Sequence, residues 1–77
     1  MGRYNGHRSW NAWNVALWIG NDEPLYRTAI DCLDQTQTLD AAVNLFCRVV
    51  VCLGDRTPDG AVYNRTCIRE ALAGLRS

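Results

Sequence analysis

The sequence from residue 10 to residue 24 reads WNAWNVALWIGNDEP, a long apolar run that ends in a helix-stop signal. At about 100° per residue, Trp10, Trp13 and Leu17 share one face of a helix, while alanine, valine and isoleucine cover much of the opposite side. A helix that is apolar nearly all round is typically a buried one. We therefore predict a buried helix over residues 10–20, with Trp10 and Trp13 in the core.

The same segment carries two asparagines and a third tryptophan. Asn14 and Asn21 lie along the tryptophan face, and buried amides need hydrogen-bond partners. We expect both asparagines to bond to a neighbouring loop or helix end. Trp18 lies about 80° from Trp10 around the helix, at the edge of that face, and is expected to be partly exposed. It is either a core residue or a partner-binding residue, since tryptophan is enriched in interface hot spots.

Capping residues and apolar spacing predict two further helices. Asp22 is the expected N-cap of a helix that runs to about Asp34. Thr38 is the expected N-cap of a third helix, whose inward-facing apolar positions continue to Leu53. Residues 48–52 are β-prone, so a strand is the alternative interpretation there.

The rest of the chain predicts a turn and one more helix. Residues 57–60 read TPDG, a strong turn signal, and a last helix begins near Asn64 or Thr66. Together the segments predict an all-α fold, a compact single-domain bundle of about four short helices over residues 9–77. Residues 1–8 are polar, include two glycines, and are expected to form a flexible tail.

Eight arginines and eight acidic residues give the 77-residue chain no net charge. A chain of this length buries only about 60% of its unfolded surface, so it holds one small core and no large cofactor cradle. Without a basic excess it does not resemble a histone-like nucleic-acid binder. The charge is unevenly distributed: residues 22–40 hold five acidic side chains and one arginine, a net charge of −4, and the remaining three acidic and seven basic residues sum to +4.

The sequence offers no arrangement suited to catalysis or metal binding. Its four cysteines are spaced 15, 5 and 15 residues apart and match neither a zinc ribbon nor a redox CxxC pattern: Cys32, Cys47, Cys52 and Cys67. The single histidine, His7, lies in the polar tail. We predict a non-enzymatic protein with reduced, buried cysteines and with no metal, cofactor or catalytic residue.

Targeting and membrane signals are missing from the sequence. No apolar run follows the charges at the N-terminus, as a signal peptide would require. No run approaches the ~20 residues of a membrane span. We therefore expect a cytoplasmic protein without a membrane partner.

Two charged surfaces are candidate partner-binding sites. The first is acidic and would mimic phosphates or meet a basic groove, unless it is an ordinary solvated surface; it consists of Asp22, Glu23, Asp31, Asp34 and Asp40. The second is one flank of the last helix, which would contact phosphate or an acidic protein, or again be solvated; it consists of Arg65, Arg69 and Arg76. Three arginines are too few for strong non-specific DNA affinity, so direct nucleic-acid binding is not the favoured interpretation.

Residues 13–23, followed by Leu25-Tyr26, resemble the signature T-W-N-V-x-L-W-x-x-N-D-E-x-L-Y of a family of small proteins found in tailed bacteriophages, prophages and related mobile elements. Members often carry the T-P-D-G that stands here at residues 57–60. Ala12 replaces the usual threonine, and Pro24 stands where glycine is common. The motif covers about a quarter of the chain, and the resemblance implies no catalytic residues. It implies an accessory protein in the cytoplasm of an infected or lysogenic bacterial host, where such proteins often inhibit host defence.

Three functions follow as hypotheses. The leading one is an inhibitor that binds a host defence complex, most plausibly a CRISPR effector, with its acidic stretch competing for the nucleic-acid-binding surface. The alternative is a small nucleic-acid-binding or regulatory adaptor that uses the arginines of the last helix. The third is a structural module that forms a homodimer through Trp18 and the third helix.

Overall fold

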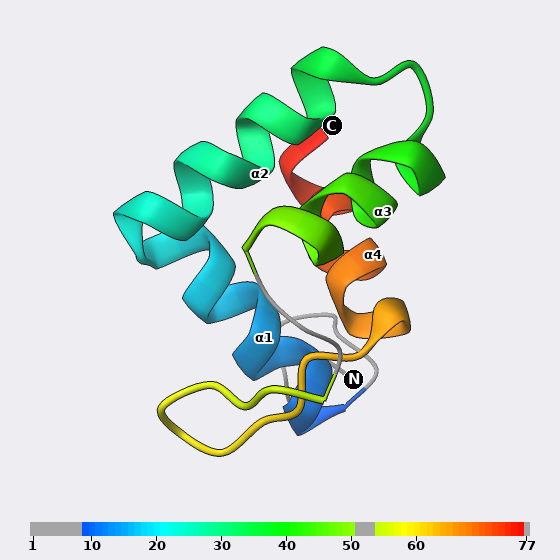
Figure 1. Ribbon diagram of the computed structural model, residues 1–77. Coiled ribbons are helices and arrows are strands. Elements are labelled where there is room, and N and C mark those ends of the chain that lie inside the picture. The colour runs from blue at the N-terminus through cyan, green and yellow to red at the C-terminus, as the bar shows by residue number, and fades with distance from the viewer. Residues whose placement is uncertain (1–8, 51–53, 77) are drawn as a thin grey trace.

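The computed structural model describes residues 9–50 and 54–76. Over these ranges the chain contains four helices and no strand, as Figure 1 shows: α1 (Trp10–Asn21), α2 (Glu23–Gln35), α3 (Leu39–Val49) and α4 (Arg65–Arg76). The prediction of an all-α bundle of about four short helices is confirmed. The predicted tail at residues 1–8 lies outside the described residues, and so does Cys52.

Each helix begins where a short polar side chain can satisfy an unpaired backbone N–H. The side-chain oxygens of Ser9, Asp22, Thr38 and Asn64 each accept a hydrogen bond from the backbone N–H three residues further on, at 2.8–3.2 Å. Such a cap typically contributes about 0.5–2 kcal/mol to stability. Local chemistry therefore sets the four helix starts.

The third helix ends earlier than its apolar spacing predicts. α3 stops at Val49, and the backbone N–H of Val50 closes it on the carbonyl of Phe46 at 3.1 Å. Val49 is 59% exposed, so little burial offsets the entropy that a β-branched side chain loses in a helix. The strand interpretation is wrong for residues 48 and 49, which are helical. The rest of the predicted extension, residues 51–53, lies outside the described part of the chain.

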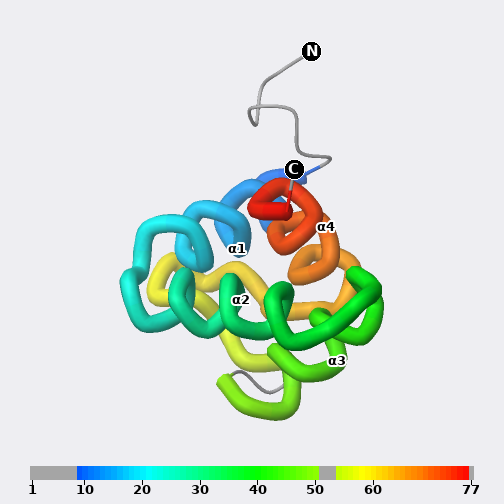
Figure 2. Tube along the Cα trace, turned by 90° about the horizontal axis from the view of Figure 1, so that it is seen from above, coloured from blue at the N-terminus to red at the C-terminus, as the bar shows by residue number. Residues whose placement is uncertain are grey.

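The helices pack in a closed ring. α1 contacts α2 and α4, and α3 contacts the same two helices from the other side. Figure 2 shows this from above, with α1 and α4 on one side and α2 and α3 on the other. The interior is filled by small and branched side chains with one phenylalanine and one tyrosine: Ala12, Val15, Ile19, Ala29, Cys32, Ala42, Val43, Phe46, Ala61, Tyr63, Cys67, Ile68, Ala71 and Leu72.

Helix α1 buries a different face from the predicted one. Trp10 is 40% exposed and Trp13 is only half-buried, so the prediction of Trp10 as a core residue is wrong. The buried face instead carries Ala12, Val15 and Ile19. Because apolar side chains lie on both the tryptophan face and the opposite face of α1, their spacing does not say which of the two is buried. The small side chains of the second face let α2 and α4 approach closely. No helix in the described part of the chain is long and apolar enough to cross a membrane.

A hairpin loop, residues 54–63, connects α3 to α4 and is the long yellow loop below the helices in Figure 1. Arg56 and Val62 form a single antiparallel bridge. The backbone N–H of Thr57 donates to Ala61 at 2.8 Å, and that of Gly60 donates to Thr57 at 2.9 Å. Gly60 has φ +97°, a conformation that side chains disfavour. The predicted turn at residues 57–60 is therefore confirmed, and its glycine is required by geometry.

Candidate functional site

Four polar side chains from α1 and the hairpin loop form one hydrogen-bonded cluster, which we call the polar node: Asn14, Trp18, Thr57 and Asp59. The side-chain oxygen of Asn14, Oδ1, accepts a hydrogen bond from the Thr57 hydroxyl at 2.6 Å, and the side-chain Nδ2 of Asn14 donates to Asp59 Oδ2 at 2.9 Å. The same Oδ2 accepts a bond from the Trp18 indole N–H at 2.9 Å. Asn14 and Thr57 are buried, and their side chains are fully bonded. The node therefore anchors the hairpin to α1.

Asn11 extends this attachment by one turn of α1. Its Oδ1 accepts a bond from the Val62 N–H at 2.7 Å, while its Nδ2 donates to the Val62 carbonyl at 2.8 Å and to Cys67 Sγ at 3.3 Å. The amide thus bonds to both backbone groups of Val62, as a neighbouring strand would. The predicted bonding of Asn14 to a loop is confirmed. Asn21 is exposed and donates only to the Leu17 carbonyl of its own helix, so its predicted burial is wrong.

The two parts of the sequence signature meet at the node. Asn14 and Trp18 belong to the first part, and Thr57 and Asp59 belong to TPDG. Because these bonds are internal, they give the signature a structural role in joining helix to hairpin. Trp18, predicted to be partly exposed, is half-buried, with its only polar atom bonded to Asp59. Sequence reasoning missed Asn11 and Asp59, although Asn11, Asn14 and Trp18 recur at helical spacing on one face.

The predicted acidic surface divides into three separate parts. Asp22 caps α2 through its side chain, and Asp40 at the start of α3 bonds to Arg69. Only three of the five predicted acids lie together, on the outer surface of α2, which we call the α2 face: Glu23, Asp31 and Asp34, with Arg27 among them. All four are exposed.

Charges on the α2 face are only partly paired. Glu23 and Arg27 form an ion pair at 2.6 Å, with side chains 71% and 74% exposed. Asp31 and Asp34 form no hydrogen bond or ion pair with the described residues. Beside them Tyr26 is 41% exposed, and a shallow hollow is lined by Tyr26, Arg27, Ile30 and Asp31. The face thus combines an aromatic ring, an apolar floor and two carboxylates that have no partner among the described residues.

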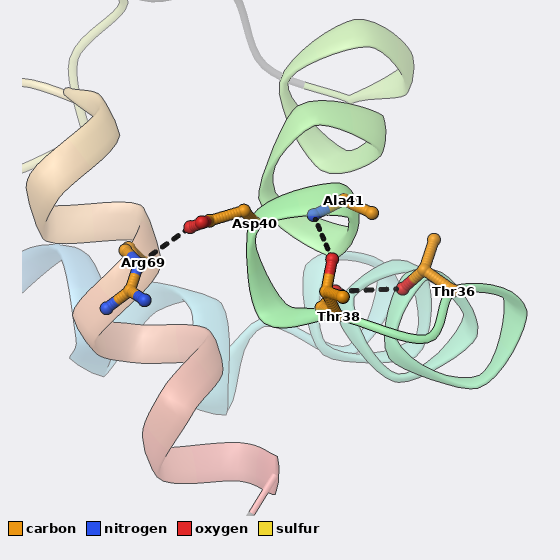
Figure 3. Close-up of polar contacts among 5 residues, drawn as sticks. All are labelled: Thr36, Thr38, Asp40, Ala41 and Arg69. Carbon is orange, nitrogen blue, oxygen red and sulfur yellow. Dashed lines mark hydrogen bonds and ion pairs between the residues drawn. The ribbon is translucent and has the colours of Figure 1, made fainter.

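The arginine flank of α4 is exposed as predicted, but its charges are partly engaged. Arg69 Nε donates to Asp40 Oδ1 at 2.8 Å, as Figure 3 shows. Arg76 donates a longer bond, 3.4 Å, to the carbonyl of Gln37. The hydrogen bond and charge of Arg69, with a smaller contribution from the charge of Arg65, lower the pKa of Asp40. The two surfaces that sequence analysis kept apart therefore meet at the Asp40–Arg69 pair.

Two of the thiols in the described part of the chain, Cys32 and Cys47, are poor nucleophiles. Burial raises the pKa of both Cys32 and Cys47, which keeps them as thiols at neutral pH. Within residues 9–50 and 54–76, no three histidine, cysteine or acidic side chains gather where they would hold a metal ion. The absence of catalytic and metal chemistry stays a prediction for the whole chain.

Acid should weaken the attachment of the hairpin, because hydrogen bonds from Asn14 and Trp18 lower the pKa of Asp59. A carboxyl whose pKa is lower in the folded state stabilises the fold above its unfolded-state pKa, and this contribution is lost as pH falls through the folded-state value. We expect the urea midpoint to stay level down to about pH 5 and to fall below about pH 4.

Two variants check this assignment. Asp59→Asn keeps an oxygen that accepts both bonds but does not titrate, so the decline in acid should become shallower. Asp31→Asn removes a carboxyl that forms no hydrogen bond or ion pair with the described residues, and it is the control for the loss of one negative charge. Equal profiles for Asp59→Asn and the unmodified protein would contradict the assignment.

Comparison with known proteins identifies a family for the chain but no activity. Residues 1–73 match the family model of DUF7249, described as a family of unknown function. No curated protein and no solved structure matches the chain. The function must therefore be argued from the surfaces described above.

Proposed function

The chain belongs to the DUF7249 family, whose function is unknown, and we propose that it is a non-enzymatic inhibitor that binds a nucleic-acid-binding protein complex through the α2 face. The observation that carries this proposal is the exposed pair Asp31 and Asp34, without an ion-pair partner among the described residues, beside the exposed ring of Tyr26. Such a surface suits a basic groove. By occupying that groove, the protein excludes the nucleic acid.

The α2 face has the composition of a protein-binding surface. Tyr26 and Ile30 supply an apolar centre, and the charges around them form a polar rim, an arrangement common in interfaces. Free carboxylates pair well with guanidinium groups, whose two parallel N–H donors match the two oxygens. The Glu23–Arg27 pair is exposed and worth at most about 1 kcal/mol, so Glu23 can exchange Arg27 for a partner's arginine.

The arginine flank of α4 is a weaker candidate for nucleic-acid binding than the α2 face is for protein binding. Arg69 is already paired with Asp40, and the Asp40 carboxylate, 67% exposed, would repel a phosphate at the same place. Arg65 remains without a hydrogen bond or ion pair in the described residues. Arg65 and Arg76, the two arginines of the flank without an ion pair among the described residues, give little of the counterion release on which phosphate binding depends. The α2 face is therefore the better candidate.

The resemblance of residues 13–26 to proteins of tailed phages and mobile elements supports a setting and a target class. The setting is the cytoplasm of an infected or lysogenic bacterium. The target class is a host defence complex, and a CRISPR effector is the first to examine because its guide–target duplex lies in a positively charged channel.

Co-purification with CRISPR effector complexes, followed by a DNA-binding competition assay, tests the proposal. The unmodified protein should bind the effector and block its DNA binding. The double variant Asp31→Lys/Asp34→Lys should weaken the inhibition at least about tenfold, or about 1.4 kcal/mol. Both side chains are exposed, so the variant should fold normally, which circular dichroism checks.

Arg65→Glu is the control, because it reverses a charge on the basic surface of the protein, the arginine flank of α4. It should leave effector binding unchanged. Inhibition that survives the double variant, or that is lost only in Arg65→Glu, would overturn the assignment to the α2 face. Direct DNA affinity that falls steeply with salt would favour the nucleic-acid-binding adaptor instead.

A further inference from the structure

The face of α1 that points away from the core is apolar, and the described residues leave part of it exposed. Trp10 is 40% exposed and Leu17 is 37% exposed, with Trp13 half-buried between them. Gly20, also exposed, continues the same line three residues further on. We call these four residues the α1 seam. Their spacing of three, four and three residues is that of the contact line between two packed helices.

Charge narrows the choice of partner for the α1 seam. Helix α1 contains no charged residue, and the charged side chains of the α2 face and of the arginine flank lie on α2 and α4. The Asp59 carboxylate of the hairpin loop reaches α1 at Asn14 and Trp18, which are not part of the α1 seam. A strongly charged partner would therefore gain nothing here. In a two-fold interface the same patch meets itself, and a neutral apolar patch does so without like-charge repulsion. The α1 seam is thus complementary to a second copy of itself.

Side-chain size in the α1 seam also fits a particular register. When two copies of α1 run antiparallel and cross near residue 15, Trp13 of one lies opposite Leu17 of the other, and Trp10 lies opposite Gly20. The largest side chain then faces the residue that has none. A Cβ atom built at Gly20 meets nothing within 4 Å in the single molecule, so open space is present at that position.

We propose that the protein forms a two-fold homodimer through antiparallel packing of the α1 seam against that of a second copy. This contact uses a surface different from the α2 face and does not depend on effector binding. It also differs from self-association through Trp18, whose indole N–H is bonded within the molecule to Asp59.

The size of the α1 seam sets the strength of the dimer. A tryptophan offers at most about 250 Å², so Trp10 contributes about 100 Å² of exposed surface. The whole seam amounts to roughly 200–300 Å² per molecule, well below the ~800 Å² per partner of a standard interface. We expect a reversible dimer that forms only at high protein concentration.

Sedimentation equilibrium from about 10 μM to about 1 mM tests the dimer, a range that covers weak affinities. The unmodified protein should shift from monomer to dimer. Leu17→Glu brings two carboxylates into the interface and should raise the dissociation constant at least about tenfold. Tyr26→Glu is the matched control, because Tyr26 on α2 is similarly exposed at 41% and lies outside the α1 seam. It should leave the dimer unchanged.

A second variant tests the register. The Cβ atom of Gly20→Phe has open space in the single molecule, and its ring would fill the site that Trp10 of the second copy would occupy, so the variant should also weaken the dimer. A protein that stays monomeric at about 1 mM, or a dimer indifferent to Leu17→Glu, would overturn the proposal. A dimer indifferent to Gly20→Phe would overturn its antiparallel register. Because Leu17→Glu leaves the α2 face intact, effector binding by that variant separates the two proposals.

Discussion

Replacing Asn14 by alanine is expected to lower the free energy of unfolding by about 2–4 kcal/mol. Asn14 is 2% exposed, and both ends of its amide are bonded to the hairpin loop. The substitution leaves the buried Thr57 hydroxyl without its acceptor and removes one of the two donors to Asp59. Leaving a buried polar group unpaired costs more than a hydrogen bond contributes on average, and networks amplify the loss.

The expected loss is large relative to the total free energy of unfolding of the protein. A domain of 77 residues is typically stable by about 4–12 kcal/mol, at about 0.05–0.15 kcal/mol per residue. Urea unfolding followed by tryptophan fluorescence measures the loss. Asn21→Ala is the control, because the Asn21 amide is exposed and bonds within its own helix; it should change stability by no more than about 0.5 kcal/mol. Equal effects of the two substitutions would mean that the polar node does not hold the hairpin.

Asn14→Asp separates size from charge at the same position. The side chain keeps its shape, but the amide donor to Asp59 becomes a second carboxylate at hydrogen-bond distance. Like charges this close disfavour each other's ionisation. The variant should therefore gain stability as pH falls from about 7 to about 4. The unmodified protein should gain none over this range, because its stability stays level down to about pH 5. A variant that loses stability over this range would contradict the model of a shared Asp59 contact.

Phe46→Ala should have the largest effect of all, about 3–5 kcal/mol. Phe46 is fully buried and is the largest completely buried side chain among the described residues. It lies on α3, which faces both α2 and α4, so its removal opens a cavity beneath three helices at once. The urea midpoint should fall sharply while the slope of the transition stays constant, because the surface exposed on unfolding hardly changes.

Val49→Ala is the matched control on the same helix. Val49 is 59% exposed and packs against little, so its truncation should change stability by no more than about 0.5 kcal/mol. A loss below about 1 kcal/mol for Phe46→Ala would mean that the core lies elsewhere. Phe46→Ala should weaken effector binding only to the extent that it unfolds the protein, whereas Asp31→Lys/Asp34→Lys should weaken binding in a folded protein.

Helix starts and the charged faces of two helices could be predicted from sequence because they depend on residues a few positions apart. Asp22 and Thr38 cap the helices that follow them, and Asp31 and Asp34 lie outside because apolar positions define the inner face of α2. The exposure of Trp10 could not be predicted in the same way. Apolar side chains lie on both sides of α1, so their spacing does not say which side is buried, and packing against α2 and α4 decides it.

The partners of the polar side chains were decided only by tertiary structure. Asn14 and Asp59 lie 45 residues apart in the sequence, and Asp40 and Arg69 lie 29 apart. Capping and periodicity act over about one helical turn, so the sequence alone determined four helices, their starts and an excess of acid on α2. Hydrogen bonds and ion pairs between distant segments depend on the angles at which helices pack. That packing joined Asn14 to the hairpin, removed Asp40 from the acidic surface, and left the tryptophan side of α1 exposed.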